Sequence, residues 1–134
     1  ERIGDLAKNI AKRAQRLDEN VNPEMRNAII RMSQPVSRQL NDVLNAYASA
    51  NADKAKAVWS SDDDIDHHYN SVFREMLTYL VEDPRRISAG AHMLFMAKNL
   101  ERIGDHCTNI AEFVYYQAVG DYLSELERPK QNQV

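Results

Sequence analysis

Glycine and proline are scarce in this chain, with four of each among 134 residues. Because a β fold needs frequent turns, this scarcity, together with abundant Ala, Leu, Glu, Lys, Arg, Asn and Asp, favours helices. No apolar run approaches the roughly 18 residues that a membrane-spanning helix needs, and no secretory signal pattern is present. The formal net charge of -3 provides no basic surface for nucleic acid.

Cysteine and the usual catalytic motifs are also lacking. A single cysteine, Cys107, cannot form an intramolecular disulfide, which favours a reducing compartment, and we expect a cytoplasmic protein. There is no Glu-x-x-His element of a ferritin-like di-iron oxidase, no glycine-rich phosphate loop and no nucleophile with a paired base. The sequence therefore predicts a protein that is not an enzyme.

What the chain does contain is an internal repeat. Residues 1–5 are identical to residues 101–105, and residues 9–11 are identical to residues 109–111, so both blocks share an offset of 100 residues. Eight identities in eleven positions exceed what composition alone gives, which indicates a repeated structural unit. Only the second copy follows a long helical module, so we expect this chain to be part of a longer protein.

The repeated block carries a family resemblance. Two copies of Glu-Arg-Ile-Gly-Asp-x-x-x-Asn-Ile-Ala, with Tyr-Leu-Val-Glu-Asp-Pro-Arg at residues 79–85 ahead of the second, resemble the PhoU family of phosphate-signalling regulators. The resemblance covers residues 1 to about 120 and implies an all-α fold built from tandem three-helix bundles. It implies that the chain contains one orphan helix from the first bundle (1–21), an antiparallel three-helix bundle (22–120) and a polar tail (121–134).

Periodicity and capping residues predict the helix boundaries. Asn22 and Asp83 each precede a proline, which combines an N-cap residue with a proline at the first helical position. Asp53 is expected to cap a third helix, and Gly120 is expected to end a fourth. We expect helices over residues 1–18, 23–50, 53–82 and 84–119.

Four carboxylates are predicted to meet on the third and fourth helices. Asp62 and Asp66 lie four residues apart, as do Glu101 and Asp105, so each pair shares one side of its helix. If the chain turns between Asp83 and the following proline, Asp66 lies 17 residues before the turn and Glu101 17 after it, and the other two carboxylates lie 21 away. Each pair repels by about 4 kcal/mol at about 4 Å and an effective dielectric constant near 20. Basic side chains, raised pKa values or a bound cation must offset this repulsion.

The PhoU resemblance implies a use for these carboxylates. In the family, a Glu/Asp-x-x-x-Asp motif is implicated in binding multinuclear iron or zinc on the bundle surface. The first copy of the site is expected to be incomplete, because the helix that would face it lies outside this chain. On this resemblance the metal ligands are Glu101, Asp105, Asp62 and Asp66 for the second copy and Glu1 and Asp5 for the first, with Asn9, Asn109 and Glu112 as hydrogen-bonding neighbours.

Simpler interpretations of the same residues stand beside this one. An acidic stripe opposite an apolar one is usually a solvated helix face, and Asn9 and Asn109 fit surface amides equally well. His67 and His68 follow Asp66 in sequence, but on a helix they point away from its side, and we expect them to face solvent.

Two classes of function remain. The resemblance implies a cytoplasmic negative regulator of phosphate uptake and phosphate-starvation signalling that binds protein partners. In the family these partners are the ATPase of the phosphate ABC transporter and a sensor histidine kinase, so contact with the membrane would come only through partners. The alternative is a helical bundle that binds or stores metal and has no phosphate-signalling role.

The first helix is predicted to lack a partner within the chain. Its apolar stripe would be buried in the longer protein by helices outside this chain, and fully burying an Ile or Leu side chain contributes about 1.5–3 kcal/mol. We therefore expect the helix to fray or to pack against another copy, and we predict a homodimer or higher oligomer. The stripe consists of Ile3, Ala7, Ile10, Ala14 and Leu17.

Overall fold

The computed structural model describes residues 1–17 and 21–123, all of whose regular elements are helical. Most of the predicted polar tail lies outside these residues. No described helix is both long enough and apolar enough to cross a membrane. In chain order the elements are α1 (Arg2–Ala14), α2 (Pro23–Ser49), α3 (Ala52–Ser60), α4 (Asp62–Glu82), the 3-10 turn η1 (Pro84–Arg86) and α5 (Ile87–Val119).

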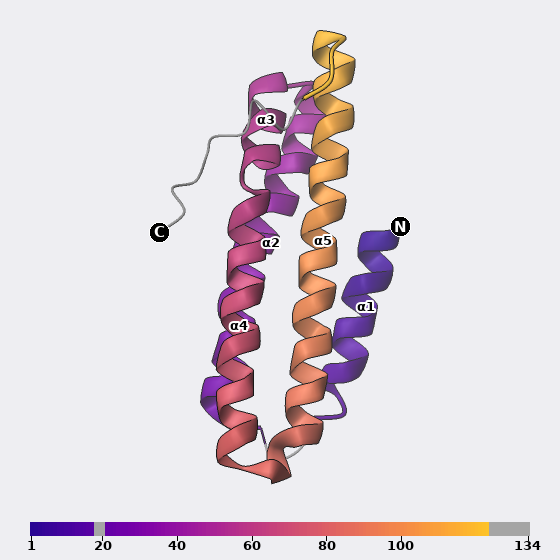
Figure 1. The fold of residues 1–134 in the computed structure, drawn as a ribbon. Coiled ribbons are helices and arrows are strands. Elements are labelled where there is room, and N and C mark those ends of the chain that lie inside the picture. Colours follow the sequence, from indigo (N-terminus) through magenta and orange to yellow (C-terminus); the bar gives the residue numbers. More distant parts are fainter. Residues whose placement is uncertain (18–20, 124–134) are drawn as a thin grey trace.

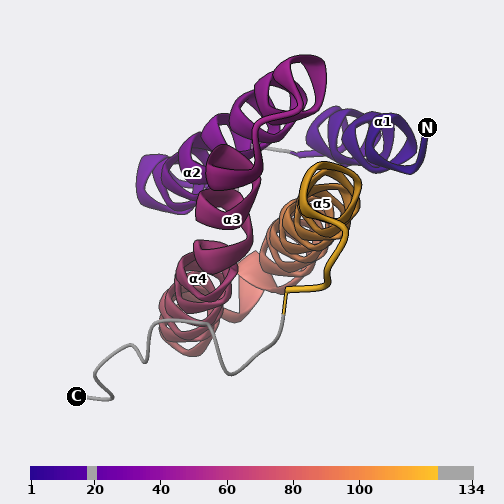
Figure 2. The same cartoon turned by 90° about the horizontal axis from the view of Figure 1, so that it is seen from above.

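The helices form an elongated bundle in which α5 contacts each of the other α-helices (Figure 1). Seen from above, α2, α4 and α5 enclose the core, α3 lies above α4, and α1 lies against the far side of α5 (Figure 2). This arrangement agrees with the predicted antiparallel three-helix bundle preceded by one extra helix. The largest fully buried side chains are Trp59, Met25, Met32, Met76, Met93, Val43 and Cys107.

Capping residues fix the ends of the long helices as expected. The side chain of Asn22 accepts a hydrogen bond of 2.8 Å from the backbone N–H of Met25, and α2 then runs without interruption through Pro35. Asp83 accepts from the backbone N–H of Arg85 and so caps η1. Gly120 ends α5 at a φ of 78°, a conformation that glycine adopts without steric cost.

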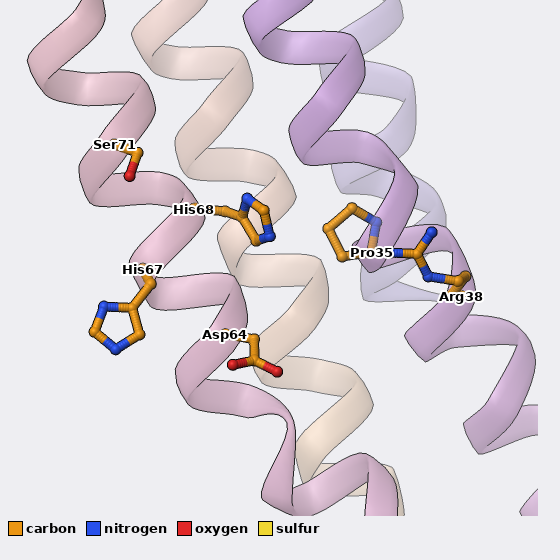
Figure 3. Close-up of a pocket in the computed structure, with 6 residues that line it drawn as sticks. All are labelled: Pro35, Arg38, Asp64, His67, His68 and Ser71. Atoms are coloured by element: carbon orange, nitrogen blue, oxygen red, sulfur yellow. The ribbon is translucent and has the colours of Figure 1, made fainter. Parts of the chain in front are cut away.

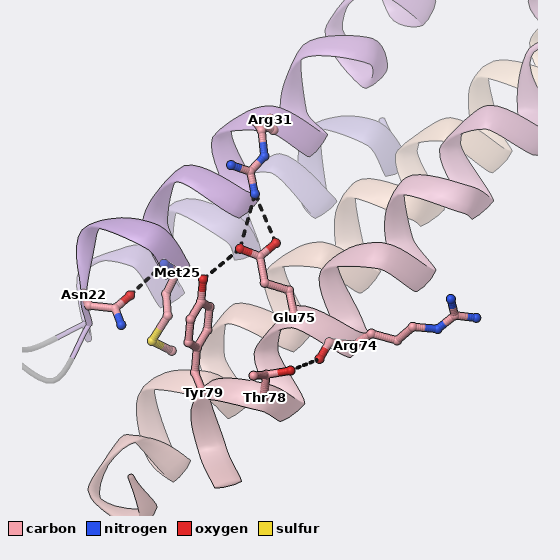
Figure 4. Close-up of polar contacts among 7 residues, drawn as sticks. All are labelled: Asn22, Met25, Arg31, Arg74, Glu75, Thr78 and Tyr79. Carbon is pink, nitrogen blue, oxygen red and sulfur yellow. Dashed lines mark hydrogen bonds and ion pairs between the residues drawn. The ribbon is translucent and has the colours of Figure 1, made fainter. Parts of the chain in front are cut away.

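Polar contacts also join α2 to α4 near the lower end of the bundle (Figure 4). Arg31 Nη2 on α2 lies 3.0 Å from Glu75 Oε2 on α4, and the Tyr79 hydroxyl donates to Glu75 Oε1 at 2.8 Å. Partial burial raises the pKa of Tyr79, and its hydrogen bond to the Glu75 carboxylate adds to the rise. Glu75 therefore links the two helices beside the apolar core.

The prediction of a single third helix over residues 53–82 is wrong, because the segment breaks at Ser61 into α3 and α4. Asn51 caps α3 in place of Asp53, by accepting from the backbone N–H of Lys54 at 3.0 Å. The hydroxyl of Ser61 donates to the Val58 carbonyl at 2.7 Å. From the core, Gln39 Nε2 donates to that carbonyl and to the Ser61 hydroxyl at 3.4 and 3.3 Å, so a buried tertiary contact stabilises the break.

The expectation that the first helix frays or needs another copy is also wrong, since α1 packs on its own α5 (Figure 1). The helix ends at Ala14, earlier than predicted. Leu6 belongs to its packed face, whereas Ala7 and Ala14 are exposed. The contact with α5 already covers part of the apolar stripe, so this stripe no longer requires a second copy of the chain. The predicted homodimer stays a prediction, which light scattering across a dilution series can test.

Contacts at the lower end of α1 hold it against α5. The Arg13 guanidinium lies 4.0 Å from the centre of the Phe95 ring, and Arg13 Nη1 lies 3.3 Å from His92 Nδ1. Phe95 is 54% exposed rather than buried in the core. Its ring instead forms a cation–π contact with the Arg13 guanidinium of α1.

The two glycines at matching positions of the repeat are expected to respond oppositely to alanine. A Cβ at Gly104 would lie 3.2 Å from both Gln39 Oε1 and Ile65 Cγ2, which are buried, whereas a Cβ at Gly4 meets nothing within 4 Å. We expect Gly104→Ala to cost about 1–2 kcal/mol through overpacking and Gly4→Ala to add up to about 1 kcal/mol through helix propensity. Urea unfolding measures both, and equal changes in the two variants would contradict the packing difference.

Candidate functional site

The candidate site lies on the face shared by α4 and α5. Thr108 Oγ1 on α5 donates to Asp62 Oδ1 on α4 at 3.0 Å. About two turns further down, Lys98 Nζ lies 5.1 Å from the centre of the Tyr69 ring. These contacts confirm the predicted antiparallel register, because they place the upper part of α4 beside residues 98–108 of α5.

The register brings the four predicted carboxylates together. The pKa of Asp66 is raised from 3.8 to about 6, mainly by desolvation and then by the charges of Asp62, Glu101 and Asp105. Desolvation also raises the pKa of Asp105, and Asp62 and Glu101 add to the rise. Carboxylates from both helices therefore act on one another as a single electrostatic cluster.

A lysine offsets part of this negative charge. Lys98 Nζ lies 3.0 Å from Glu101 Oε1, one turn away on the same helix, and the Lys98 charge also opposes the rise in the pKa of Asp105. The raised pKa values of Asp66 and Asp105 persist despite this ion pair. The cluster thus keeps an excess of negative charge that a bound cation would reduce.

The closest carboxylates include one that the sequence prediction missed. Asp62, Asp63 and Asp66 each offer an oxygen atom within 4.8 Å of the oxygens offered by the other two. This spacing suits oxygen donors that share one cation at the metal–oxygen distances usual in proteins. Asp63 lies three residues before Asp66 in the first turns of α4, so the two share a side of the helix, and this spacing was its signal in the sequence.

The predicted site residues outside the four-carboxylate cluster do not belong to this group of three. Glu1, Asp5 and Asn9 are exposed on or just before α1, and Asn109 is exposed on α5. Glu112 is engaged elsewhere, since its Oε1 accepts a hydrogen bond of 3.1 Å from the Trp59 indole. The first copy of the repeat therefore presents its acidic residues on a separate helix surface.

The two histidines lie on another side of α4. Both are exposed as expected, and Figure 3 shows His68 and Asp64 pointing toward α2. There they border an open hollow of about 300 Å³ between the two helices. Its lining consists of Pro35, Arg38, Asp64, His67, His68 and Ser71.

Comparison with known proteins identifies the family. A family model described as the PhoU domain matches residues 29–114. The chain belongs to the PhoU family. It is 50% identical over 131 residues to the "Phosphate-specific transport system accessory protein PhoU homolog" of Caulobacter vibrioides (strain NA1000 / CB15N), covering 97% of this chain and 56% of the relative. The Rhizobium meliloti (strain 1021) homolog of the same name is 47% identical over 131 residues, covering 97% of this chain and 55% of the relative.

Solved structures agree with this membership. The crystal structure of PhoU from Pseudomonas aeruginosa matches with a TM-score of 0.85 and 38% identity, over 90% of this chain and 58% of that one. The PhoU structure from Streptococcus pneumoniae matches with a TM-score of 0.80 and 30% identity, over 92% of this chain and 58% of that one. The chain therefore spans little more than half the length of these relatives, and the predicted family and helical fold are confirmed.

Replacing Asp66 with Asn is expected to stabilise the fold in a pH-dependent way. Because the folded-state pKa of Asp66 is about 6 and its ordinary value is 3.8, the folded chain binds this proton more tightly, and stability falls as pH rises between these values. Asp66→Asn should therefore gain up to about 1 kcal/mol at about pH 7.5, limited by solvent screening, and almost nothing at about pH 4. Urea unfolding at both pH values is the measurement. A gain of the same size at both pH values would mean that ionisation of Asp66 is not its cause.

Proposed function

We propose that this chain is part of a cytoplasmic regulator of phosphate uptake and phosphate-starvation signalling that acts by binding protein partners. The supporting observation is the match over 97% of the chain to relatives named phosphate-specific transport system accessory proteins. The proposed effect is negative: the protein restrains phosphate import and starvation gene expression when phosphate is ample. The proposed partners are the ATPase of the phosphate ABC transporter and a sensor histidine kinase, and no catalytic activity is proposed.

We further propose that the carboxylates between α4 and α5 bind iron or zinc. Asp62, Asp66, Glu101 and Asp105 act on one another electrostatically, and Asp63 adds a nearby oxygen donor. Oxygen donors at this spacing fit a cation, which would neutralise the excess charge and tie the two helices together. In the first copy of the repeat, Glu1 and Asp5, with Asn9 beside them, would contribute to a second site. Asn109 keeps its proposed place beside the α5 ligands.

The alternative function is metal binding or storage without phosphate signalling, and the acidic cluster by itself favours it. A binding experiment separates the two. The purified chain is immobilised and exposed in turn to the purified transporter ATPase and to the cytoplasmic part of the sensor kinase. Regulation through partners predicts saturable binding to at least one of them. Metal uptake with binding to neither would support the storage alternative and contradict the regulatory one.

Whether the protein lowers or raises phosphate-starvation gene expression is tested in cells. In cells grown with ample phosphate, deletion of the gene should raise expression from a phosphate-starvation promoter, and the restored gene should lower it again. Unchanged expression in the deletion strain would contradict negative regulation, even if partner binding were observed in vitro.

A further inference from the structure

Below the carboxylates, the same α4–α5 face exposes large apolar side chains. Phe73, Leu77 and Val81 follow one another at intervals of four residues on α4, and Val81 is 83% exposed. Ile87, at the start of α5 just past the turn, is 57% exposed. Side chains four apart share one side of a helix, so these residues extend one apolar strip toward the lower end of the bundle.

The apolar strip continues directly from the acidic cluster. Glu101 pairs with Lys98, Lys98 lies over the ring of Tyr69, and the Tyr69 and Phe73 ring centres are 6.3 Å apart. From Asp66 to Val81 the surface is about 22 Å long at the rise of an α-helix. One continuous face thus has an acidic upper half and an apolar lower half.

A protein surface of this kind suits a helix with two different halves. An exposed apolar strip along α4 matches the apolar side of an amphipathic helix, which binds through residues spaced three and four apart. The carboxylates above the strip would attract Lys or Arg and repel both acidic segments and anionic lipid. Because the apolar and acidic halves are about two helical turns apart, a matching partner has its basic residues beyond its apolar anchors.

We propose that in the metal-free chain this face binds an amphipathic α-helix of a protein partner, with apolar anchors on Phe73, Leu77 and Val81 and basic side chains on the exposed carboxylates Asp66 and Asp105. The proposal deepens the proposed function, since it rests on action through protein partners and names the surface and the partner chemistry. Neither the transporter ATPase nor the sensor kinase is needed to test it.

The probe is a synthetic 20-residue helix with leucines along one side of its first half and lysines along the same side of its second half. A matched peptide carries Glu in place of each Lys. Fluorescence anisotropy follows binding to the whole chain in the presence of a chelator, which leaves the carboxylates available. We expect the lysine peptide to bind, and the glutamate peptide and the Leu77→Asp variant each to weaken binding at least about tenfold.

Leu44→Asp on α2 is the matched control, because Leu44 is an exposed leucine of another face, and it should change affinity less than about twofold. Val81→Asp repeats the test if Leu77→Asp lowers the helix content measured by circular dichroism. No binding of the lysine peptide, equal binding of the glutamate peptide, or equal losses in the Leu77 and Leu44 variants would overturn the proposal. A peptide-free dimer that Leu77→Asp dissociates would overturn it in favour of a second copy. None of these results bears on whether the transporter ATPase or the kinase binds elsewhere on the chain.

Discussion

Replacing Glu101 with Gln and Asp105 with Asn in one variant is expected to remove most of the chain's capacity for iron or zinc. Both residues act electrostatically on the Asp66 carboxylate across the α4–α5 face, so the double variant removes the α5 side of the proposed site. Changes beside metal ligands typically weaken binding about 10–100-fold, and we expect the loss of two ligands to exceed about 100-fold. Elemental analysis after chelator treatment and reloading with metal at about pH 7.5 measures the uptake.

The repeat supplies a control for this experiment. Glu1→Gln with Asp5→Asn removes the same two residue types from the first copy, where both side chains are exposed on or just before α1. We expect this control to retain most of the metal bound by the parent chain. Equal uptake by the parent and the Glu101/Asp105 variant would contradict the proposed α4–α5 metal site.

Trp59→Ala is expected to cost about 3–5 kcal/mol of unfolding free energy, the usual range for a buried aromatic side chain. Trp59 is 1% exposed, and its indole N–H donates to Glu112 on α5, so the substitution leaves a cavity and removes a link between α3 and α5. Glu112→Gln keeps an acceptor for the indole and should cost less than about 1 kcal/mol. Urea unfolding of both variants is the measurement. If Trp59→Ala lowers the unfolding free energy no more than Glu112→Gln does, α3 contributes little to the stability of the fold.

Much of this arrangement follows from local sequence. Asn22 and Asp83 combine a capping side chain with a following proline, and both act as caps in the structure. The turn after Asp83 sets the register of α4 against α5, which is why the meeting of Asp66 with Glu101 could be predicted by counting residues. A tight turn between two long helices leaves few other registers.

Features that depend on tertiary contacts could not be predicted in this way. The break at Ser61 is stabilised by Gln39, which is about 20 residues away in sequence and buried in the core. Gly4 and Gly104 have identical neighbours in sequence but open and crowded surroundings respectively.

The packing of α1 illustrates the same limit. Its apolar stripe indicates a buried face, but periodicity does not say which element covers that face. One side of α5 closes the bundle with α2 and α4, and α1 packs on another side of the same helix. The prediction of an unpartnered helix failed because the stripe was assigned to helices outside this chain rather than to α5.

The most direct test of the α4–α5 cluster is the pKa of the Asp66 carboxyl group, followed by NMR in the parent chain and in the Glu101→Gln, Asp105→Asn variant, both without metal. If the two helices bring their carboxylates together as described, Asp66 titrates at about 6 in the parent and closer to its ordinary value of 3.8 in the variant. A pKa near 3.8 in both proteins would contradict the cluster.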